Sequence, residues 1–92
     1  MPYEIEITPF YTKRLVKFLK KHPDIQTKYR KTISMLELNP FHPSLRLHKL
    51  SGKLSDLHSV SIDMSYRITI EFYIKDEKII PVNIGTHDDV YS

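Results

Sequence analysis

The fold follows from the stretch Tyr66–Ile74, which reads YRITIEFYI and alternates apolar and polar side chains without a break. A period of two residues is typical of a strand that buries one face. The polar residues Lys75–Lys78 then interrupt the pattern before a second apolar run, Ile79–Ile84. Two such runs around a short polar break predict a β-hairpin, with Arg67 on its polar face.

The chain continues directly from this hairpin into Gly85–Tyr91, which reads GTHDDVY. A glycine that lets the backbone turn, a histidine, two acids and a tyrosine at the end of a strand indicate a functional site. Arg67 lies on the face that such a tail can reach. Pro81 is unusual, because it lacks the amide donor that a strand needs and therefore belongs at a sheet edge or at a bulge. The sequence leaves both placements open.

The N-terminal part predicts one strand and two helices. Residues 3–7 alternate in the same way as the hairpin. Thr8 is followed by a proline, which is the pattern of an N-cap and a first helical residue. This helix must end just before Pro23. Asp24 is placed to cap a second helix, whose apolar stripe continues until Asn39.

Two shorter strands are predicted between the helices and the hairpin, at Leu45–Leu50 and within Leu54–Asp63. Strands joined by short turns are antiparallel, and helices joined by a short connection are antiparallel neighbours. We therefore predict a single α+β domain over residues 1–92. Its two N-terminal antiparallel helices are expected to pack on one face of a mainly antiparallel sheet of four to five strands.

Composition narrows the class of protein. The net charge of +3 permits binding to nucleic acid without requiring it. The chain has no cysteine, so a disulfide framework, a thiolate nucleophile and a cysteine zinc site are excluded. Its apolar runs are too short to cross a membrane, and its first residues do not form a signal peptide. We expect a cytoplasmic protein that binds no metal and no cofactor.

Three residue types in the strands and at their ends fit RNA cleavage without a metal. Histidine can accept or donate the protons, arginine can hold the phosphate, and an aromatic ring can stack on a base. His87 is the strongest candidate for proton transfer, and a solvated terminal histidine is the alternative. Arg67 is the candidate for the phosphate. The alternative for Arg67 is a surface arginine paired with Glu71 or Asp63.

A second group of candidates lies around the predicted strand at Leu45–Leu50. His48 has the same parity as Arg46, and Lys49 and Lys53 lie close in sequence, so the four residues could form a cationic patch that binds RNA. A solvated strand face is the alternative.

Three further residues complete the candidates. Tyr73 has the parity of the polar face and could stack on a base, although a surface tyrosine is common in strands. Tyr91 is a candidate because it belongs to the segment Gly85–Tyr91 after the hairpin. The alternative for Tyr91 is a disordered tail. His58 shares parity with apolar residues and is expected in the core or at its rim.

Four segments together resemble the RelE/ParE toxin superfamily. They are Leu47–Gly52, Ser65–Ile68, Ile84–His87 and the closing Tyr91, and their order and spacing carry the match more than any single motif. The Gly-Thr-His ending resembles the YafQ-like branch. The resemblance covers nearly the whole chain. It implies a toxin that cuts messenger RNA in the ribosomal A site and is neutralised by an antitoxin protein.

The resemblance also implies roles for single residues. His87 matches a catalytic acid or base, Arg67 matches an arginine that contacts the scissile phosphate, and His48 matches a functional histidine. Tyr91 matches an aromatic residue of the active site that stacks or donates a proton.

Two positions depart from the YafQ-like branch. Ser61 stands where that branch has a second histidine, and Ser65 stands where it has an aspartate. The Arg67 pattern is closer to RelE, so the predicted site resembles a hybrid of the two.

The simplest interpretation of the basic residues on the two helices is that they form solvated faces. In RelE-like toxins such positive surface meets ribosomal RNA. Two other functions remain open. One is a ParE-like toxin that acts on DNA gyrase without cutting RNA, against which His87, Arg67 and Tyr91 argue together. The other is an inactive module that only binds an antitoxin.

Overall fold

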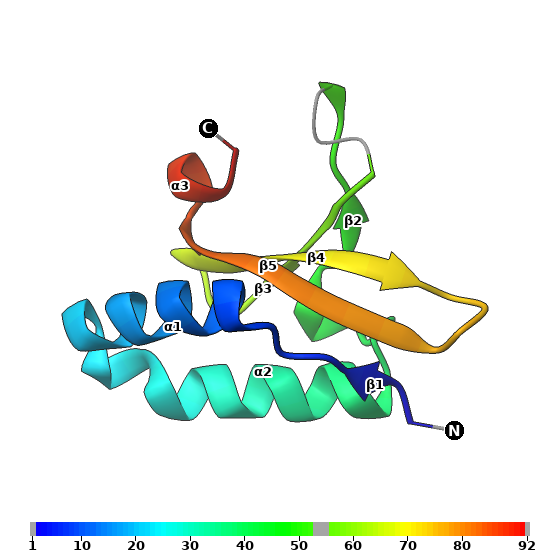
Figure 1. Ribbon diagram of the computed structural model, residues 1–92, viewed down its shortest axis with the longest axis horizontal. Helices are drawn as coiled ribbons and strands as arrows, with labels where there is room; N and C mark the ends of the chain where they lie inside the picture. Colours follow the sequence, from blue (N-terminus) through cyan, green and yellow to red (C-terminus); the bar gives the residue numbers. More distant parts are fainter. Residues whose placement is uncertain (1, 53–55, 92) are drawn as a thin grey trace.

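A computed structural model describes residues 2–52 and 56–91 of the chain, without the side chains of Asp89 and Tyr91 (Figure 1). The helices and strands follow each other as β1 (Glu4–Ile5), α1 (Pro9–Lys21), the 3₁₀ turn η1 (Pro23–Ile25), α2 (Gln26–Leu38), the 3₁₀ turn η2 (Pro43–Leu45), β2 (His48–Lys49), β3 (His58–Ser61), β4 (Tyr66–Tyr73), β5 (Lys78–Thr86) and α3 (His87–Tyr91).

The strands form one five-stranded sheet in the order β1-β5-β4-β3-β2. Neighbouring strands are antiparallel except β1 and β5, which run parallel. The parallel pair is possible because most of the chain separates these two strands. The predicted α+β class with a mainly antiparallel sheet and the predicted hairpin of β4 and β5 are therefore confirmed.

The ends of the first helix follow the predicted signals, whereas the start of the second does not. Thr8 is the N-cap of α1, and its Oγ1 accepts a hydrogen bond from the backbone N–H of Tyr11 at 3.1 Å. The predicted cap at Asp24 is wrong, because Pro23 begins the 3₁₀ turn η1 and Asp24 lies inside it. Ile25 occupies the cap position of α2 without a side-chain hydrogen bond.

The core lies between the helices and the sheet. In Figure 1, α1 and α2 lie on the same side of the sheet, and α1 contacts β5. The buried side chains of this core come from both layers: Tyr11, Phe18, Tyr29 and Leu36 from the helices, and Val60, Ile68, Ile70, Ile79 and Ile84 from the strands. The hydroxyls of Tyr11 and Tyr29 join α1 to α2 at 3.1 Å. Burial raises the pKa of Tyr11 far above its usual value, so this hydroxyl stays protonated.

The predicted strand over Leu45–Leu50 is mostly wrong. Leu45 ends the 3₁₀ turn that starts at Pro43, and Arg46 follows in a left-handed conformation with φ 48° and ψ 46°. Only His48 and Lys49 pair with β3. Leu50 follows β2 and is buried, although its parity is that of the exposed His48.

Pro81 lies at a bulge rather than at a sheet edge. Thr69 pairs with Asn83 while its neighbour Ile70 pairs with Pro81, so Val82 is an extra residue on β5. A bulge leaves a backbone position unpaired, and Pro81 can therefore occupy a central strand without an amide hydrogen.

The polar face of the hairpin is partly covered by the C-terminal segment. That segment forms the short helix α3 and not the predicted end of a strand, and it contacts both β4 and β5. Val90 is buried in this contact, and Thr69 is buried on the polar face of β4. Figure 1 shows α3 and β2 on the side of the sheet opposite α1 and α2.

Candidate functional site

Arg67 is the centre of the polar face. The ladder of β3 and β4 pairs it with Ser61, which places Ser59 two residues further along on the same face. The Nε atom of Arg67 donates to Ser59 Oγ at 2.6 Å. The Nη2 atom lies 3.5 Å from the carbonyl oxygen of Arg46 and 3.3 Å from Nδ1 of His48. Three neighbours from two strands and a turn thus hold one guanidinium.

None of these neighbours is negatively charged, and Arg67 has no ion pair within the part of the chain that the structure describes. The alternative in which Arg67 pairs with Glu71 or Asp63 is therefore wrong. Asp63 pairs instead with Lys28 at 3.3 Å, and Glu71 accepts a hydrogen bond from the Tyr73 hydroxyl at 2.6 Å. Arg67 keeps its full positive charge in a fixed position, which is what binding of a phosphate requires.

His48 and Arg46 lie beside this guanidinium. His48 pairs with Ser59 across β2 and β3, and its Nδ1 lies 3.1 Å from the Arg46 carbonyl oxygen. The side chains of Arg46 and His48 are both exposed. The predicted grouping of the two residues is thus present, and the structure adds Arg67 to it.

His87 starts α3 two residues after Gly85, and Gly85 is the cross-strand partner of Arg67 on β5. Paired strands lie about 5 Å apart, so the chain enters α3 close to Arg67. The side chain of His87 is exposed. His87 also takes part in a polar, ring or electrostatic interaction. Tyr91 closes the same helix, and its side chain lies outside the described residues.

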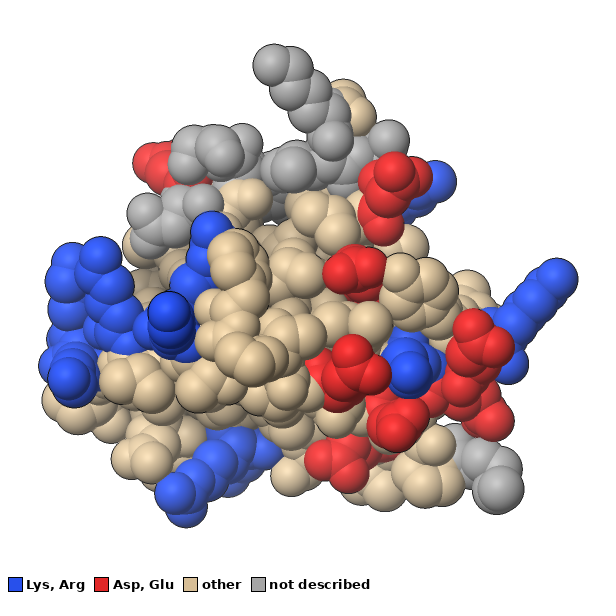
Figure 2. All heavy atoms as spheres, viewed as in Figure 1, with Lys and Arg blue, Asp and Glu red and all other residues tan. Residues whose placement is uncertain are grey.

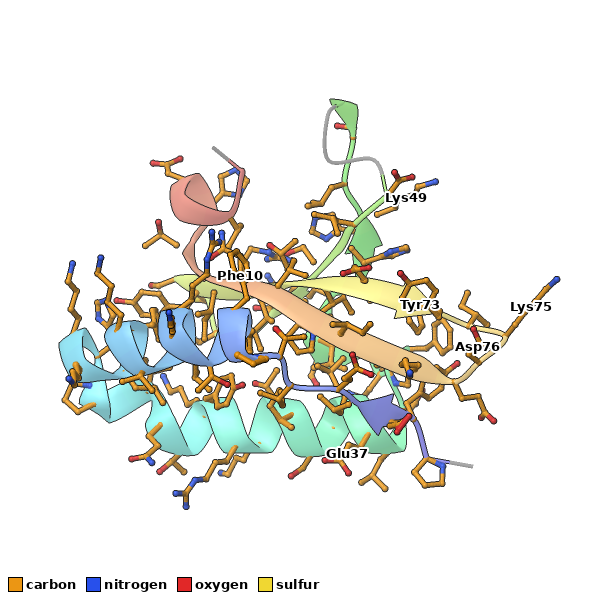
Figure 3. All side chains as sticks on the ribbon, viewed as in Figure 1. Phe10, Glu37, Lys49, Tyr73, Lys75 and Asp76 are labelled. Atoms are coloured by element: carbon orange, nitrogen blue, oxygen red, sulfur yellow. The ribbon has the colours of Figure 1, made fainter. Side chains whose placement is uncertain are left out.

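The other residues that were predicted to bind RNA do not all lie near Arg67. Lys49 is exposed on β2, next to His48 (Figure 3). Lys53 lies outside the described residues. Tyr73 is the last residue of β4 and lies beside the hairpin turn (Figure 3). The strand separates Tyr73 from Arg67 by about 20 Å, at roughly 3.3 Å per residue. The structure therefore does not bring Tyr73 into the group around Arg67.

His58 lies at the rim of the core, as its parity predicted. It is half-buried, and its ring meets Phe72 edge-on with the ring centres 5.4 Å apart. Burial lowers the pKa of His58, and the nearby charges of Lys49 and His48 lower it further. His58 therefore packs against an aromatic ring at the rim of the core and lies outside the group that holds Arg67.

Two features of the structure were not found in the sequence. Ser59 could have been noticed only through its shared face with Arg67, because a buried serine carries no signal of its own. The second is a pocket of about 330 Å³ between α1 and β5, whose lining includes Arg14, Lys17 and Lys21. Their spacing of three and four residues places them on one helix face, which is a readable signal. Figure 2 shows Lys and Arg side chains gathered over the end of the molecule where α1 lies.

Within residues 2–52 and 56–91, no group of three metal-binding side chains lies close enough together to hold an ion. No described helix is long and apolar enough to cross a membrane.

No family model matches the chain, and no curated protein matches it in sequence. Solved structures do match. YafQ from Escherichia coli strain BL21(DE3) superposes with a TM-score of 0.78 at 16% identity, over 98% of this chain and 99% of that one. This is the fold of the RelE/YafQ-type toxins.

Two further structures with this fold come from other bacteria. A metal-bound toxin from Helicobacter pylori has a TM-score of 0.73 and 21% identity, over 98% of this chain and 99% of that one. The RelBE2 toxin–antitoxin complex from Mycobacterium tuberculosis has a TM-score of 0.62 and 13% identity, over 95% and 100%. The resemblance to RelE and YafQ is therefore confirmed for the fold over nearly the whole chain.

Proposed function

We propose that this protein is the toxin of a type II toxin–antitoxin system and cleaves messenger RNA on the ribosome without a metal. The observation that carries the proposal is the fixed charge of Arg67, which is held by Ser59, the Arg46 carbonyl and His48 and has no ion pair among the residues that the structure describes. A structural arginine in this position would be expected to pair with one of the nearby carboxylates. The toxin fold of the solved neighbours supports the same class of function.

The chemistry assigns a role to each group. The 2′-hydroxyl of a ribose attacks the adjacent phosphorus, and the bond to the 5′-oxygen breaks. Arg67 stabilises the charge that gathers on the phosphate oxygens. His48 and His87 carry the two proton transfers, and Tyr91 supplies an aromatic group at the same helix. Arg46, Lys49 and Lys53 contribute positive charge along the RNA.

The basic surface of α1 and the toxin-like fold each suggest a partner. The pocket lined by Arg14, Lys17 and Lys21 gives α1 a basic surface that suits ribosomal RNA. An antitoxin would cover the face that carries Arg67, as an antitoxin accompanies the toxins in the DinJ–YafQ and RelBE2 complexes. We expect a cytoplasmic heteromeric complex of toxin and antitoxin.

The test is primer extension on an mRNA translated in a purified system. The parent protein should produce discrete cuts, and Arg67→Ala should lower the rate by roughly 10²–10³, the loss typical when one group that stabilises transition-state charge is removed. Lys75→Ala is the matched control, because Lys75 is an exposed cation at the far hairpin turn and should leave cleavage unchanged.

Two outcomes would replace the proposal. Inhibition of DNA gyrase supercoiling by a parent protein that cuts no RNA would favour the ParE-like function. Tight antitoxin binding without either activity would favour an inactive module. Metal independence is tested in a separate experiment, because one of the similar solved structures is metal-bound. Protein stripped with EDTA and desalted should cut as fast as untreated protein, and recovery only after a transition metal is added would contradict metal independence.

A further inference from the structure

The pocket of about 330 Å³ between α1 and β5 lies at the same end of the sheet as Arg67 but on the other face. Ile84 lines this pocket and directly precedes Gly85, the cross-strand partner of Arg67. Ile84 is buried on the side of the helices, whereas Arg67 lies on the polar face. The pocket is therefore separate from the group around Arg67, although β4 and β5 support both.

The lining of this pocket is cationic. Arg14, Lys17 and Lys21 all line it, and none of the described residues around it is acidic. Within residues 2–52 and 56–91, none of these three cations forms an ion pair. Like charges three and four residues apart on a helix repel each other, and α1 contains no acidic residue that could relieve the repulsion. Lys and Arg side chains gather over this end of the molecule (Figure 2).

The helix end explains only part of this charge. Lys21 lies in the last turn of α1, where a cation interacts favourably with the helix dipole. Arg14 and Lys17 lie earlier in the helix, so the dipole does not account for them. Their charge converges with that of Lys21 on one hollow, and no described carboxylate offsets it.

Aromatic rings hold the pocket in shape. The Arg14 guanidinium lies over the ring of Phe10, 4.4 Å from its centre. Phe18 lines the pocket, and its ring packs against those of His22 and Tyr66 with the centres 4.7 and 5.2 Å away. The Tyr66 hydroxyl lies 3.2 Å from Nδ1 of His22. Because one cation and the wall are already positioned, less freedom is lost when a ligand binds.

We propose that this pocket binds one phosphodiester group of RNA, separate from the scissile phosphate at Arg67. Arg14 supplies a planar fork of donors that fits phosphate oxygens, and Lys17 and Lys21 add positive charge on the same helix face. A bound phosphate also relieves the repulsion among the three cations. That the ligand is RNA rests on the proposed function, whereas the preference for a phosphate rests on the pocket itself.

The phosphodiester can belong to ribosomal RNA or to the messenger, since both offer the same chemistry. Two measurements distinguish these sources. Fluorescence anisotropy follows the binding of a short unstructured RNA to the protein alone. Co-sedimentation follows the binding of the protein to ribosomes that carry no messenger.

The test variant is Arg14→Gln/Lys21→Gln, which removes two charges from the pocket. The matched control is Lys13→Gln/Lys20→Gln, which removes the same number of charges from the same helix. Lys13 and Lys20 line a different hollow of α1 and do not line this pocket. All four side chains are exposed, so both variants should fold, and circular dichroism checks this. If a double variant unfolds, Arg14→Gln and Lys21→Gln are each compared with Lys13→Gln.

The expected result is a loss of affinity that depends on salt. Losing one phosphate contact should reduce the slope of log K against log salt by about 0.7–0.9, which gives roughly 5–15-fold weaker binding at about 50–100 mM salt. The control variant should weaken binding by less than about twofold, because its charges are solvated and screened. A loss with the short RNA identifies the messenger as the source of the phosphate. A loss with ribosomes alone identifies ribosomal RNA.

Three outcomes would overturn the inference. Equal losses in the two variants would show that α1 is a diffuse positive surface without a discrete site. Unchanged binding of Arg14→Gln/Lys21→Gln to both the RNA and the ribosomes would remove the pocket from RNA binding. A variant that loses only the antitoxin would assign the pocket to an acidic protein segment.

Failure of this inference is distinguishable from failure of the proposed function. A parent protein that binds RNA through the pocket but cuts none would refute the proposed function and leave the phosphate site in place. A parent that cuts messenger RNA, with a test variant that binds RNA and ribosomes as tightly as the control variant does, would refute the phosphate site alone.

Discussion

The two ends of β4 lie on the same face of the sheet but differ in how their charged side chains are bound. At the hairpin turn, Tyr73 is bound to Glu71, and Lys78 on the neighbouring strand pairs with Glu6 at 3.2 Å. At the other end, Arg67 is held by Ser59 and by groups of the β2 turn, and none of these partners carries a negative charge. Partners without a negative charge fix the direction of a cation without cancelling its charge. The end with Arg67 is therefore built to receive an anion, and the end with Tyr73 is not.

The difference costs the fold little. An exposed ion pair contributes about 0–1 kcal/mol to stability, so leaving Arg67 without one is inexpensive. The stability comes mainly from the opposite face of the same strand, where Ile68 and Ile70 are fully buried beneath the helices. One face of β4 can thus serve binding because the other face holds the domain together.

The largest effect is expected at His87, next to the end of β4 that carries Arg67. His87→Ala should lower the cleavage rate by roughly 10²–10⁴, the usual contribution of a general acid or base. The fold and the binding of an antitoxin should be preserved, because the His87 side chain is exposed. Single-turnover cleavage of mRNA on ribosomes measures the rate, and circular dichroism checks the fold. A folded variant that still cuts at the parent rate would remove His87 from the mechanism.

A smaller effect is expected when the support of Arg67 is removed. Ser59→Ala deletes the acceptor of the 2.6 Å bond from Nε. We expect kcat/KM to fall by about tenfold, since a hydrogen bond to a charged group contributes roughly 1.5–3 kcal/mol and Arg67 keeps its other partners.

Tyr73→Phe is the matched control, because it deletes a hydrogen bond of the same length at the other end of β4. Cleavage by this variant should match the parent. If the two substitutions reduce cleavage equally, the two ends do not differ in function and the comparison fails.

The smallest effect concerns Asp63, which binds Lys28 and not Arg67. Burial alone would raise the pKa of Asp63, but the backbone N–H groups of Ser65 and Tyr66 and the charge of Lys28 outweigh it, and the net shift is downward. Asp63→Asn should cost about 1 kcal/mol of unfolding free energy at neutral pH, because Asn keeps an oxygen that accepts from these N–H groups but loses the charge that strengthens the bonds and pairs with Lys28.

The pH dependence has a definite sign. A depressed carboxyl pKa stabilises the fold above the pKa of the unfolded chain, near 4, and the contribution is lost as the pH falls through the folded value. The gap between Asp63→Asn and parent in urea melts should therefore close in acid. A gap that stays constant down to pH 2 would show that the charge of Asp63 is not what stabilises this turn.

Local patterns were sufficient for the hairpin and for the start of α1. The alternation of β4 identified its buried face, and Thr8 before a proline identified the helix start, because both depend on neighbours within a few residues. The same parity also placed Arg67 on the polar face. It could not separate Arg67 from Tyr73, because both have the same parity and only the length of the strand sets them apart.

Other features depended on contacts between distant parts of the chain. The bulge at Pro81 exists because β4 and β5 shift their register there. The C-terminal residues form α3 because Val90 finds a buried place against the sheet. The left-handed backbone of Arg46 follows from the turn begun at Pro43, which interrupts an alternation that reads as a strand. Short-range periodicity carries no information about any of these.

The sequence by itself determined the order of the two long helices and the main strands, the apolar face of the hairpin and the residue types available for chemistry, since these depend on periodicity and side-chain identity alone. Only the tertiary structure decided which of those residues meet. In the fold, Asp63 pairs with Lys28, and Glu71 accepts a hydrogen bond from Tyr73. Arg67 is therefore bound by groups that carry no negative charge, such as Ser59. The reason is geometric: a side chain can be bound by whatever the strand register and the turns place within about 3 Å, and that distance is set by the whole fold.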